Sequence, residues 1–419
     1  MADGETHRTI ETVFRIERAR LIGGLARLVR DMDRAEELAQ DALVAALAEW
    51  PASGVPQNPG AWLMAAAKRR AIDGFRRDKM LTRKHDEMAH EFDEAHEPGA
   101  AIEAALDDDL GDEVLGLIFA ACHPVLSVEA RAALTLRVVA GLTTDEIARA
   151  FLSNEPAIAQ RIVRAKKSLA GAGLTFEVPH GDELKSRLPS VLGVIYLVFN
   201  EGYAATAGED LIRVGIGAEA QRLGRILAAA MPDVPEVFGL LALMELQASR
   251  FAARTGPDGA LVPLTEQNRA RWDRMLIQRG LAALARSEAL GGANGPYALQ
   301  AALAACHARA ATASDTDWAR IAGLYDRLRT VTPSPVIDLN RAVAHTMAFG
   351  PDSGLALLAE IEASTALRAY APLPAAKGDF LFRAGRRAEA KPEFERAAAL
   401  TRNAREKAFL LARAAACGE

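Results

Sequence analysis

The sequence predicts an all-α protein built from several domains. Half of its 419 residues are hydrophobic, a quarter are charged, Ala is abundant and alternation of β-branched residues is rare. A chain of this length usually forms roughly two to four domains. Its longest apolar run, Val191 to Phe199, is too short to cross a bilayer. The first residues, MADGETHRTIETVF, lack the basic and apolar regions of a signal peptide, so we expect a cytoplasmic protein without a membrane partner.

Charge is distributed unevenly along a chain whose net charge is −5. Residues 61–85 contain eight Lys or Arg and two Asp, whereas residues 86–113 contain twelve Asp or Glu and no Lys or Arg. The first segment favours an anionic partner. Because like charges repel, the second predicts a flexible acidic linker. This linker is either a solvated spacer or a mimic of nucleic acid that lies in a basic channel of a partner.

The segment AWLMAAAKRRAIDGFRRDK predicts a helix with one packed and one basic face. The packed face recurs every four residues, at Leu63, Ala67, Ala71 and Phe75. The opposite face places an aromatic ring among guanidinium groups, a combination that can hold phosphates while stacking an unpaired base. Its residues are Trp62, Arg69, Asp73, Arg76 and Arg77, with Arg70 at the edge. The alternative is a solvated face whose Trp62 belongs to the core.

Two shorter helices are predicted near residues 143–169. The first begins with Thr143 and Glu146 in capping-box spacing. The second begins near Pro156, with Ser153 or Asn154 as its cap. Its apolar stripe is Ile158, Ile162, Ala165 and Leu169, and the other side carries Gln160, Arg164 and Lys167, flanked by Ala157 and Arg161. The pair fits a helix-turn-helix whose second helix enters the DNA major groove; an ordinary amphipathic helix pair is the alternative.

Motifs of enzyme and cofactor sites are absent from the sequence. It contains no nucleophile elbow, P-loop or H-E-x-x-H, so we predict neither enzymatic activity nor a cofactor. Two Cys-His pairs, at residues 122–123 and 306–307, raise the possibility of a zinc site. Neighbouring helical residues point about 100° apart, however, which favours small buried cysteines.

An ordered set of motifs carries a family resemblance. The segment DRAEELAQDALVAALAEW, the Trp-Leu helix ending in AKRRAIDGFRR, the acidic linker and the helix-turn-helix follow one another. Over about Ile10 to Leu174, the chain resembles bacterial sigma-70 family factors. It is most similar to the extracytoplasmic-function group, which keeps only sigma domains two and four. The resemblance implies sigma domain two at residues 1–85, the linker at 86–113 and sigma domain four at 114–176.

The same resemblance implies three binding surfaces and two partners, core RNA polymerase and promoter DNA. The polymerase clamp would contact Asp33, Glu36, Glu37, Gln40 and Asp41. The minus-ten element would contact Trp62, Arg69, Arg70, Asp73, Arg76 and Arg77. The minus-thirty-five element would contact Ala157, Gln160, Arg161, Arg164, Lys166 and Lys167. The family pattern G-T-V-K-S-R-L-x-R-A-R is replaced here by PAIAQRIVRAK, so DNA-backbone contacts are better supported than a particular promoter sequence.

More than 200 residues follow the helix-turn-helix. They resemble the extension of a subgroup of extracytoplasmic-function sigma factors that ends in tetratricopeptide-like repeats. This implies a helical extension at 188–300, repeats at 301–419 and regulation through a protein or small molecule bound there. Small residues offset by 34 positions support the repeats, although plain helix hairpins are the alternative. These pairs are Ala344 and Gly378, Ala356 and Ala390, and Ala363 and Ala397.

The predicted function is that of an alternative sigma factor, which directs RNA polymerase to promoters. The sequence also allows two alternative functions. One is a one-component transcription regulator, with the helix-turn-helix as its DNA reader and the helical repeats as its sensor. The other is a repeat scaffold that binds DNA weakly and without sequence preference.

Overall fold

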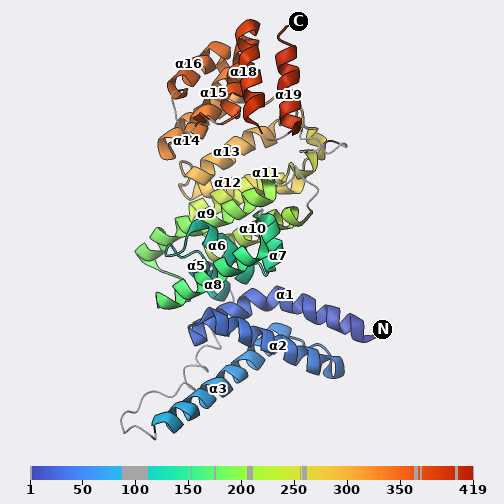
Figure 1. The fold of residues 1–419 in the computed structure, drawn as a ribbon, viewed down its shortest axis with the longest axis vertical. Helices are drawn as coiled ribbons and strands as arrows, with labels where there is room; N and C mark the ends of the chain where they lie inside the picture. Colours follow the sequence, from blue (N-terminus) through green and yellow to red (C-terminus); the bar gives the residue numbers. More distant parts are fainter. Residues whose placement is uncertain are drawn as a thin grey trace. The chain divides into compact units, whose positions relative to one another are not determined.

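The computed structural model of the chain contains helices and connecting segments, and no strand, over the residues it describes (Figure 1). The all-α prediction is therefore confirmed. The acidic linker predicted at 86–113 lies almost entirely outside the described residues. These are residues 2–86, 112–151, 153–173, 176–204, 211–254, 256, 262–362, 367–368, 370–401 and 404–418.

The chain forms two compact units. Unit 1 comprises Met1–Gly202 and Leu211–Ala230, and unit 2 comprises Tyr203–Asp210 and Met231–Glu419. The helices of unit 1 are α1 (Ala2–Val29), α2 (Met32–Ser53), α3 (Pro59–Asp86), α5 (Asp112–Ala121), α6 (Val128–Val138), α7 (Thr144–Ala150), α8 (Glu155–Gly171), α9 (Gly181–Ala204) and α10 (Leu211–Ala230). Those of unit 2 are α11 (Pro235–Ala248), η2 (Phe251–Ala253), η3 (Arg269–Arg271), α12 (Arg274–Ala289), α13 (Pro296–Arg309), α14 (Trp318–Val331), α15 (Pro335–Phe349), α16 (Pro351–Ile361), α17 (Pro372–Arg383), α18 (Arg387–Leu400) and α19 (Ala404–Ala415).

The helix α2 packs against α1 through small residues and leaves most of its acidic side chains outward. Its cap is Asp31, whose carboxylate accepts the backbone N–H of Arg34 at 2.8 Å. Ala35, Ala39 and Ala42 are buried on its inner side. Because Ala lacks a long side chain, α1 can approach the α2 backbone closely, while Glu37, Gln40 and Asp41 are exposed on the other side.

The helix α3 confirms most of its predicted packed face and corrects one position. Leu63, Ala67 and Ala71 are buried, whereas Phe75 is 44% exposed. The prediction for Phe75 was wrong because a spacing of four residues advances about 40° beyond a full turn at each step. Over three steps from Leu63, the drift reaches roughly 120°, and the ring leaves the packed side.

The predicted helix-turn-helix is present as α7 and α8. Thr143 and Glu146 form the capping box, since the Glu146 carboxylate accepts the Thr143 N–H at 2.7 Å and the Thr143 hydroxyl accepts the Glu146 N–H at 3.2 Å. The cap of α8 is Asn154, whose side chain accepts the Ala157 N–H at 2.9 Å. The predicted apolar stripe of α8 is buried throughout: Ile158, Ile162, Ala165 and Leu169.

The helix α9 is joined to α5 and α6 by hydrogen bonds within unit 1. Arg187 donates to the Phe119 carbonyl at 2.7 Å, and the Ser190 hydroxyl donates to the Cys122 carbonyl at 2.7 Å. Arg131 in turn donates to the Ser190 hydroxyl at 2.6 Å. These bonds satisfy carbonyls near the end of α5, where no intrahelical donor is available.

In unit 2, α11 supplies the cap that α13 lacks. Gly295 precedes α13 and offers no side chain, and the Glu236 carboxylate of α11 accepts the N–H groups of Tyr297 at 3.0 Å and Ala298 at 3.3 Å. A Cβ at position 295 would overlap that carboxylate. Burial raises the pKa of Glu236, and the two backbone hydrogen bonds oppose the rise.

Consecutive helices form hairpins from α14 to α19. In the hairpin of α17 and α18, a Cβ at Gly378 would lie 2.9 Å from the Phe394 ring, so the small residue permits close packing. Ala344 and Gly378 are both buried, but Ala356 is exposed while its partner Ala390 is buried. Ala363 lies outside the described residues. The 34-residue repeat accordingly stays a prediction.

The described residues bear on two expectations from the sequence, on membrane spans and on the cysteines. None of the described helices is long and apolar enough to span a membrane.

Cys122 and Cys306 are buried, and burial raises the pKa of the Cys122 thiol to about 11. Cys122 is therefore a protonated core residue at neutral pH.

The buried ring of His307 predicts acid sensitivity of the fold. Burial, with Arg250 and Arg269 nearby, lowers the pKa of His307 to about 4. Its Nδ1 is buried without a hydrogen-bond partner, and its ring packs edge-on against Trp318 at 5.4 Å. Unfolding lets the ring take up a proton below pH 6.5, so the free energy of unfolding should fall by about 3 kcal/mol between about pH 6.5 and pH 4. We expect the variant His307→Asn to show a smaller fall in urea titrations at matched pH values; an identical fall in both proteins would contradict this assignment.

Candidate nucleic-acid interface

The basic face of α3, defined as Trp62, Arg69, Arg70, Asp73, Arg76 and Arg77, begins at an aromatic pair. Trp62 is half-buried and stands nearly perpendicular to Trp50, with ring centroids 5.2 Å apart and an interplanar angle of 68°. Trp50 is almost completely buried. Edge-to-face packing is favourable for aromatic rings. Trp62 is thus held by the core through one contact while part of its surface stays accessible.

Among the described charged residues of this face, two are exposed and Arg70 reaches a neighbouring helix. Arg69 and Asp73 are exposed. Arg70 reaches α2, where its guanidinium donates to the Asp41 carbonyl and lies 3.7 Å from the Asp41 carboxylate. The side chains of Arg76 and Arg77 lie outside the described residues. The structure thus brings Arg70, predicted to contact DNA, next to Asp41, predicted to contact polymerase.

The acidic face of α2, defined as Asp33, Glu36, Glu37, Gln40 and Asp41, forms a stripe along one side of the helix. Asp33, Glu37, Gln40 and Asp41 are exposed. Arg34 pairs with Glu37 at 3.1 Å on the outer surface. The exception is Glu36, whose side chain is only 14% exposed.

The polar face of α8, defined as Ala157, Gln160, Arg161, Arg164, Lys166 and Lys167, is also divided. Gln160, Arg164 and Lys167 are exposed, as the periodicity predicts. Ala157 and Arg161 are half-buried at the flank. An exposed guanidinium and ammonium on one side of a helix can contact phosphates without rearrangement.

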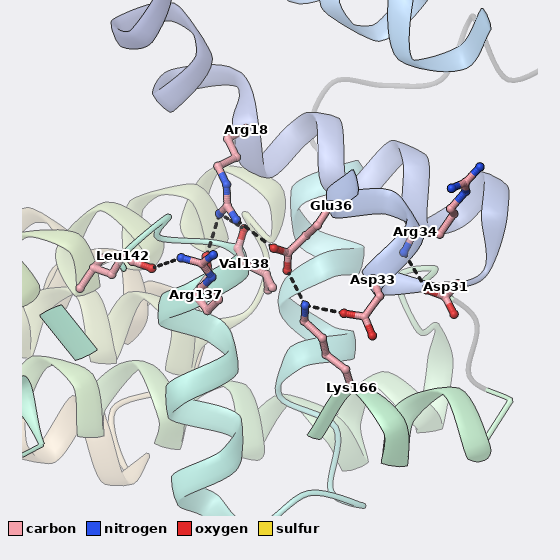
Figure 2. Close-up of polar contacts among 9 residues, drawn as sticks. All are labelled: Arg18, Asp31, Asp33, Arg34, Glu36, Arg137, Val138, Leu142 and Lys166. Carbon is pink, nitrogen blue, oxygen red and sulfur yellow. Dashed lines mark hydrogen bonds and ion pairs between the residues drawn. The ribbon is translucent and has the colours of Figure 1, made fainter. Parts of the chain in front are cut away.

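Lys166 has a different environment from the exposed residues of α8. Figure 2 shows its ammonium pointing at two carboxylates of α2. Its Nζ donates to Oδ1 of Asp33 at 2.7 Å and lies 3.0 Å from Oε1 of Glu36. The Lys166 side chain is 12% exposed. The acidic face of α2 and the polar face of α8 therefore meet at Lys166.

Arg18 of α1 is a charged residue of this contact that the sequence analysis missed. It lies 3.3 Å from the Glu36 carboxylate and donates to the carbonyls of Arg137 at 2.7 Å and Val138 at 3.4 Å (Figure 2). Burial lowers the pKa of the Arg18 guanidinium, and Glu36 opposes this effect. A single Arg within a long polar and apolar helix carries no local signal, so only the placement of α6 and α2 reveals its role.

A second ion pair joins α1 to α5. Arg20 lies 3.3 Å from the Glu113 carboxylate, and a Cβ at Gly23 would overlap the Glu113 carbonyl. Burial raises the pKa of Glu113, and Arg20 opposes the rise. Glu113 was predicted as the last residue of the acidic linker, yet it lies in the first turn of α5 and takes part in packing.

The described residues offer no evident metal ligand set. Within them, no three His, Cys, Asp or Glu side chains are placed so that they could hold a metal ion together. What the described faces supply is charge on rigid helices, which suits binding of anionic or cationic macromolecular surfaces.

Comparisons with known proteins match three segments of the chain to family models. Residues 13–80 match the family model of Sigma-70 region 2, and residues 117–169 match that of Sigma-70, region 4. Residues 187–288 match a family of unknown function, DUF6596. The chain is 40% identical over 399 residues to an uncharacterized protein of Rhizobium meliloti (strain 1021). The aligned residues make up 94% of this chain and 92% of the relative. No solved structure matches.

The faces of α2 and α3 fall within the region 2 match, and the polar face of α8 falls within the region 4 match. The roles of the individual residues stay predictions.

The cap of α8 gives a direct test of how that helix is positioned. Replacing Asn154 by Ala removes the acceptor of the Ala157 N–H and should lower the free energy of unfolding by about 1 kcal/mol. Urea denaturation of Asn154→Ala and of Ser153→Ala provides the comparison, because Ser153 is adjacent and does not cap the helix. Equal losses in the two variants would show that Asn154 is not the cap in solution.

Proposed function

This chain belongs to the sigma-70 family of RNA polymerase sigma factors and carries a C-terminal extension, and on that premise we propose how its faces act. The acidic face of α2 docks on core RNA polymerase. The basic face of α3 and the polar face of α8 contact the minus-ten and minus-thirty-five promoter elements. The extension controls this activity.

The order of the family matches is the observation that carries this proposal. A region 2 match precedes a region 4 match in one chain, so a single subunit carries a domain for each of two promoter elements. The exposure of Arg69, Arg164 and Lys167 on separate helices supports two DNA contacts. We assign the chain to the extracytoplasmic-function group because the sequence motifs follow that group's two-domain pattern.

At the minus-ten element, we assign strand separation to Trp62. A base extruded from the duplex costs a few kcal/mol, which stacking on an aromatic ring and nearby cations offset. Arg69 lies on the same face of α3 and is exposed, so it is available to a phosphate beside the extruded base. At the minus-thirty-five element, Arg164 and Lys167 clamp the backbone while Gln160 faces the base edges.

The extension regulates unit 1 because its first helix is hydrogen-bonded to the region 4 helices. The match to the family of unknown function begins at residue 187, and Arg187 and Ser190 donate to carbonyls at the end of α5. A ligand that binds two arrangements of the extension with different affinity would change the activity of unit 1. The ligand is a protein or small molecule recognised by the helical hairpins.

Truncation tests this regulatory role, provided the cut respects the packing. Removing residues from Leu188 onward would delete most of α9 and its bonds to α5 and α6, so a cut after Ala230 is preferable because it keeps every helix of unit 1. Altered transcription by the truncated protein is expected. Unaltered transcription, including its dependence on any signal, would refute regulation by unit 2.

Run-off transcription tests the central proposal. Core RNA polymerase is supplied with a promoter library, with and without the protein, and the transcripts are sequenced. Discrete new start sites with shared upstream elements are the expected result. Specific duplex binding without polymerase and without new starts would favour a one-component regulator, and weak binding of all sequences would favour a scaffold.

Arg164 should contribute one phosphate contact. Replacement by Ala should weaken promoter binding and reduce the slope of log affinity against log salt by about one unit. The control is Lys185→Ala, which removes one exposed positive charge from α9, outside the proposed DNA-binding faces. An unchanged slope and affinity for Arg164→Ala would remove this residue from the DNA site.

Trp62 should act at the opening step. Replacement by Ala should impair open-complex formation on duplex promoters by roughly five- to 150-fold, since stacking of one base contributes about 1–3 kcal/mol. Closed-complex binding should change less. A promoter with a pre-melted minus-ten element should restore most of the activity, measured by permanganate footprinting and run-off assays. If melting does not rescue the variant, Trp62 acts elsewhere.

A further inference from the structure

Two surfaces that the proposed function assigns to different partners contact each other in unit 1 (Figure 2). Asp33 and Glu36 belong to the acidic face of α2, and Lys166 belongs to the polar face of α8. We infer that Lys166 occupies the acidic site of α2 in the free protein, and that polymerase docks by supplying a Lys or Arg side chain that displaces it. This inference rests on the proposed function and specifies the chemistry of the docking partner.

The geometry is that of one ammonium shared by two carboxylates. Lys166 lies 2.7 Å from Asp33 and 3.0 Å from Glu36, and its side chain is 12% exposed. A lysine so enclosed has little freedom to reach a DNA phosphate while both contacts persist. Release of Lys166 is therefore required before it can serve the minus-thirty-five element.

Glu36 requires a cation at this site because its side chain is nearly buried. Lys166 Nζ lies 3.0 Å from Oε1, and the Glu36 side chain is 14% exposed. A carboxylate with so little hydration is tolerated only when a cation or donor replaces the water. An incoming Lys or Arg side chain that takes the place of Lys166 keeps Oε1 compensated.

Arg18 makes the exchange of cations feasible. It contacts Glu36 through Oε2 and is fixed by the carbonyls of Arg137 and Val138, so its position does not depend on Lys166. Removing the partner of a buried charge is costly, but Glu36 keeps Arg18 when Lys166 leaves. Asp33 is 63% exposed, so an incoming cation can approach it from solvent before Lys166 has departed.

Each partner then favours the other. Polymerase that takes Asp33 and Glu36 frees Lys166 for DNA, and DNA that takes Lys166 frees the carboxylates for polymerase. The coupling is reciprocal because both partners compete with the same internal contact. In the free protein, Lys166 neutralises part of the acidic face of α2.

Zero-length crosslinking tests the contact in the unmodified protein. A water-soluble carbodiimide joins a lysine amine to a carboxylate only where the two groups touch. Mass spectrometry of the free full-length chain should find Lys166 linked to Asp33 or Glu36, and saturating core polymerase should abolish that link. Absence of the link in the free protein, or its persistence in the polymerase complex, would overturn the inference.

Binding of core polymerase without DNA tests the competition. Lys166→Ala should bind polymerase about five-fold more tightly than the unmodified protein, the change that corresponds to roughly 1 kcal/mol of lost ion pairing. Lys185→Ala removes the same charge elsewhere in unit 1 and should bind like the unmodified protein. Equal or weaker binding by Lys166→Ala would overturn the inference.

The two experiments separate this inference from the proposed function. If the unmodified protein binds polymerase and the crosslink is missing, the sigma-factor proposal stands and the internal competition fails. If neither the unmodified protein nor Lys166→Ala binds polymerase at low salt, the proposed function itself fails. Binding by Lys166→Ala alone would support both.

Discussion

The nearly buried carboxylate of Glu36 must be neutralised, and the residues that neutralise it come from other helices of unit 1. Glu36 loses most of its hydration, and a desolvated charge is tolerated only when cations or donors replace the water. Arg18 from α1 and Lys166 from α8 supply that compensation, while Arg18 also satisfies two carbonyls at the end of α6. Four helices thus depend on a single charge balance, and two of them, α2 and α8, carry predicted binding surfaces.

The binding faces are rigid because small or branched apolar residues fix the opposite side of each helix. Ala35 and Ala42 hold α2, Ala67 holds α3 and Ile158 holds α8, all nearly fully buried. Polar residues on the outer sides need no support of their own beyond the helix backbone. Trp62 differs, since its orientation depends on the buried ring of Trp50.

Hydrophobic periodicity predicted these helices well, because the repeat of apolar residues that become buried can be read from a short stretch of sequence. It predicted the apolar stripe of α8, and the capping-box spacing predicted the Thr143–Glu146 cap; the structure confirms both. It failed for Phe75, because a repeat of four residues is longer than the 3.6-residue turn of the helix and moves away from the packed side. It gave no sign that Lys166 and Arg18 would meet Glu36, because ion pairs between distant segments depend on tertiary placement. Whether the 34-residue offset reflects true repeats is likewise a question of how hairpins stack.

The dependence of α13 on Glu236 has a consequence for how unit 2 folds. The first turn of an isolated helix is the costly one to form, and Gly295 gives α13 no cap of its own. The required acceptor arrives from a residue about sixty positions earlier in the chain, on α11. The first turn of α13 is therefore completed only when α11 lies beside it, so the stability of α13 is coupled to the packing of a helix that precedes it by about sixty residues.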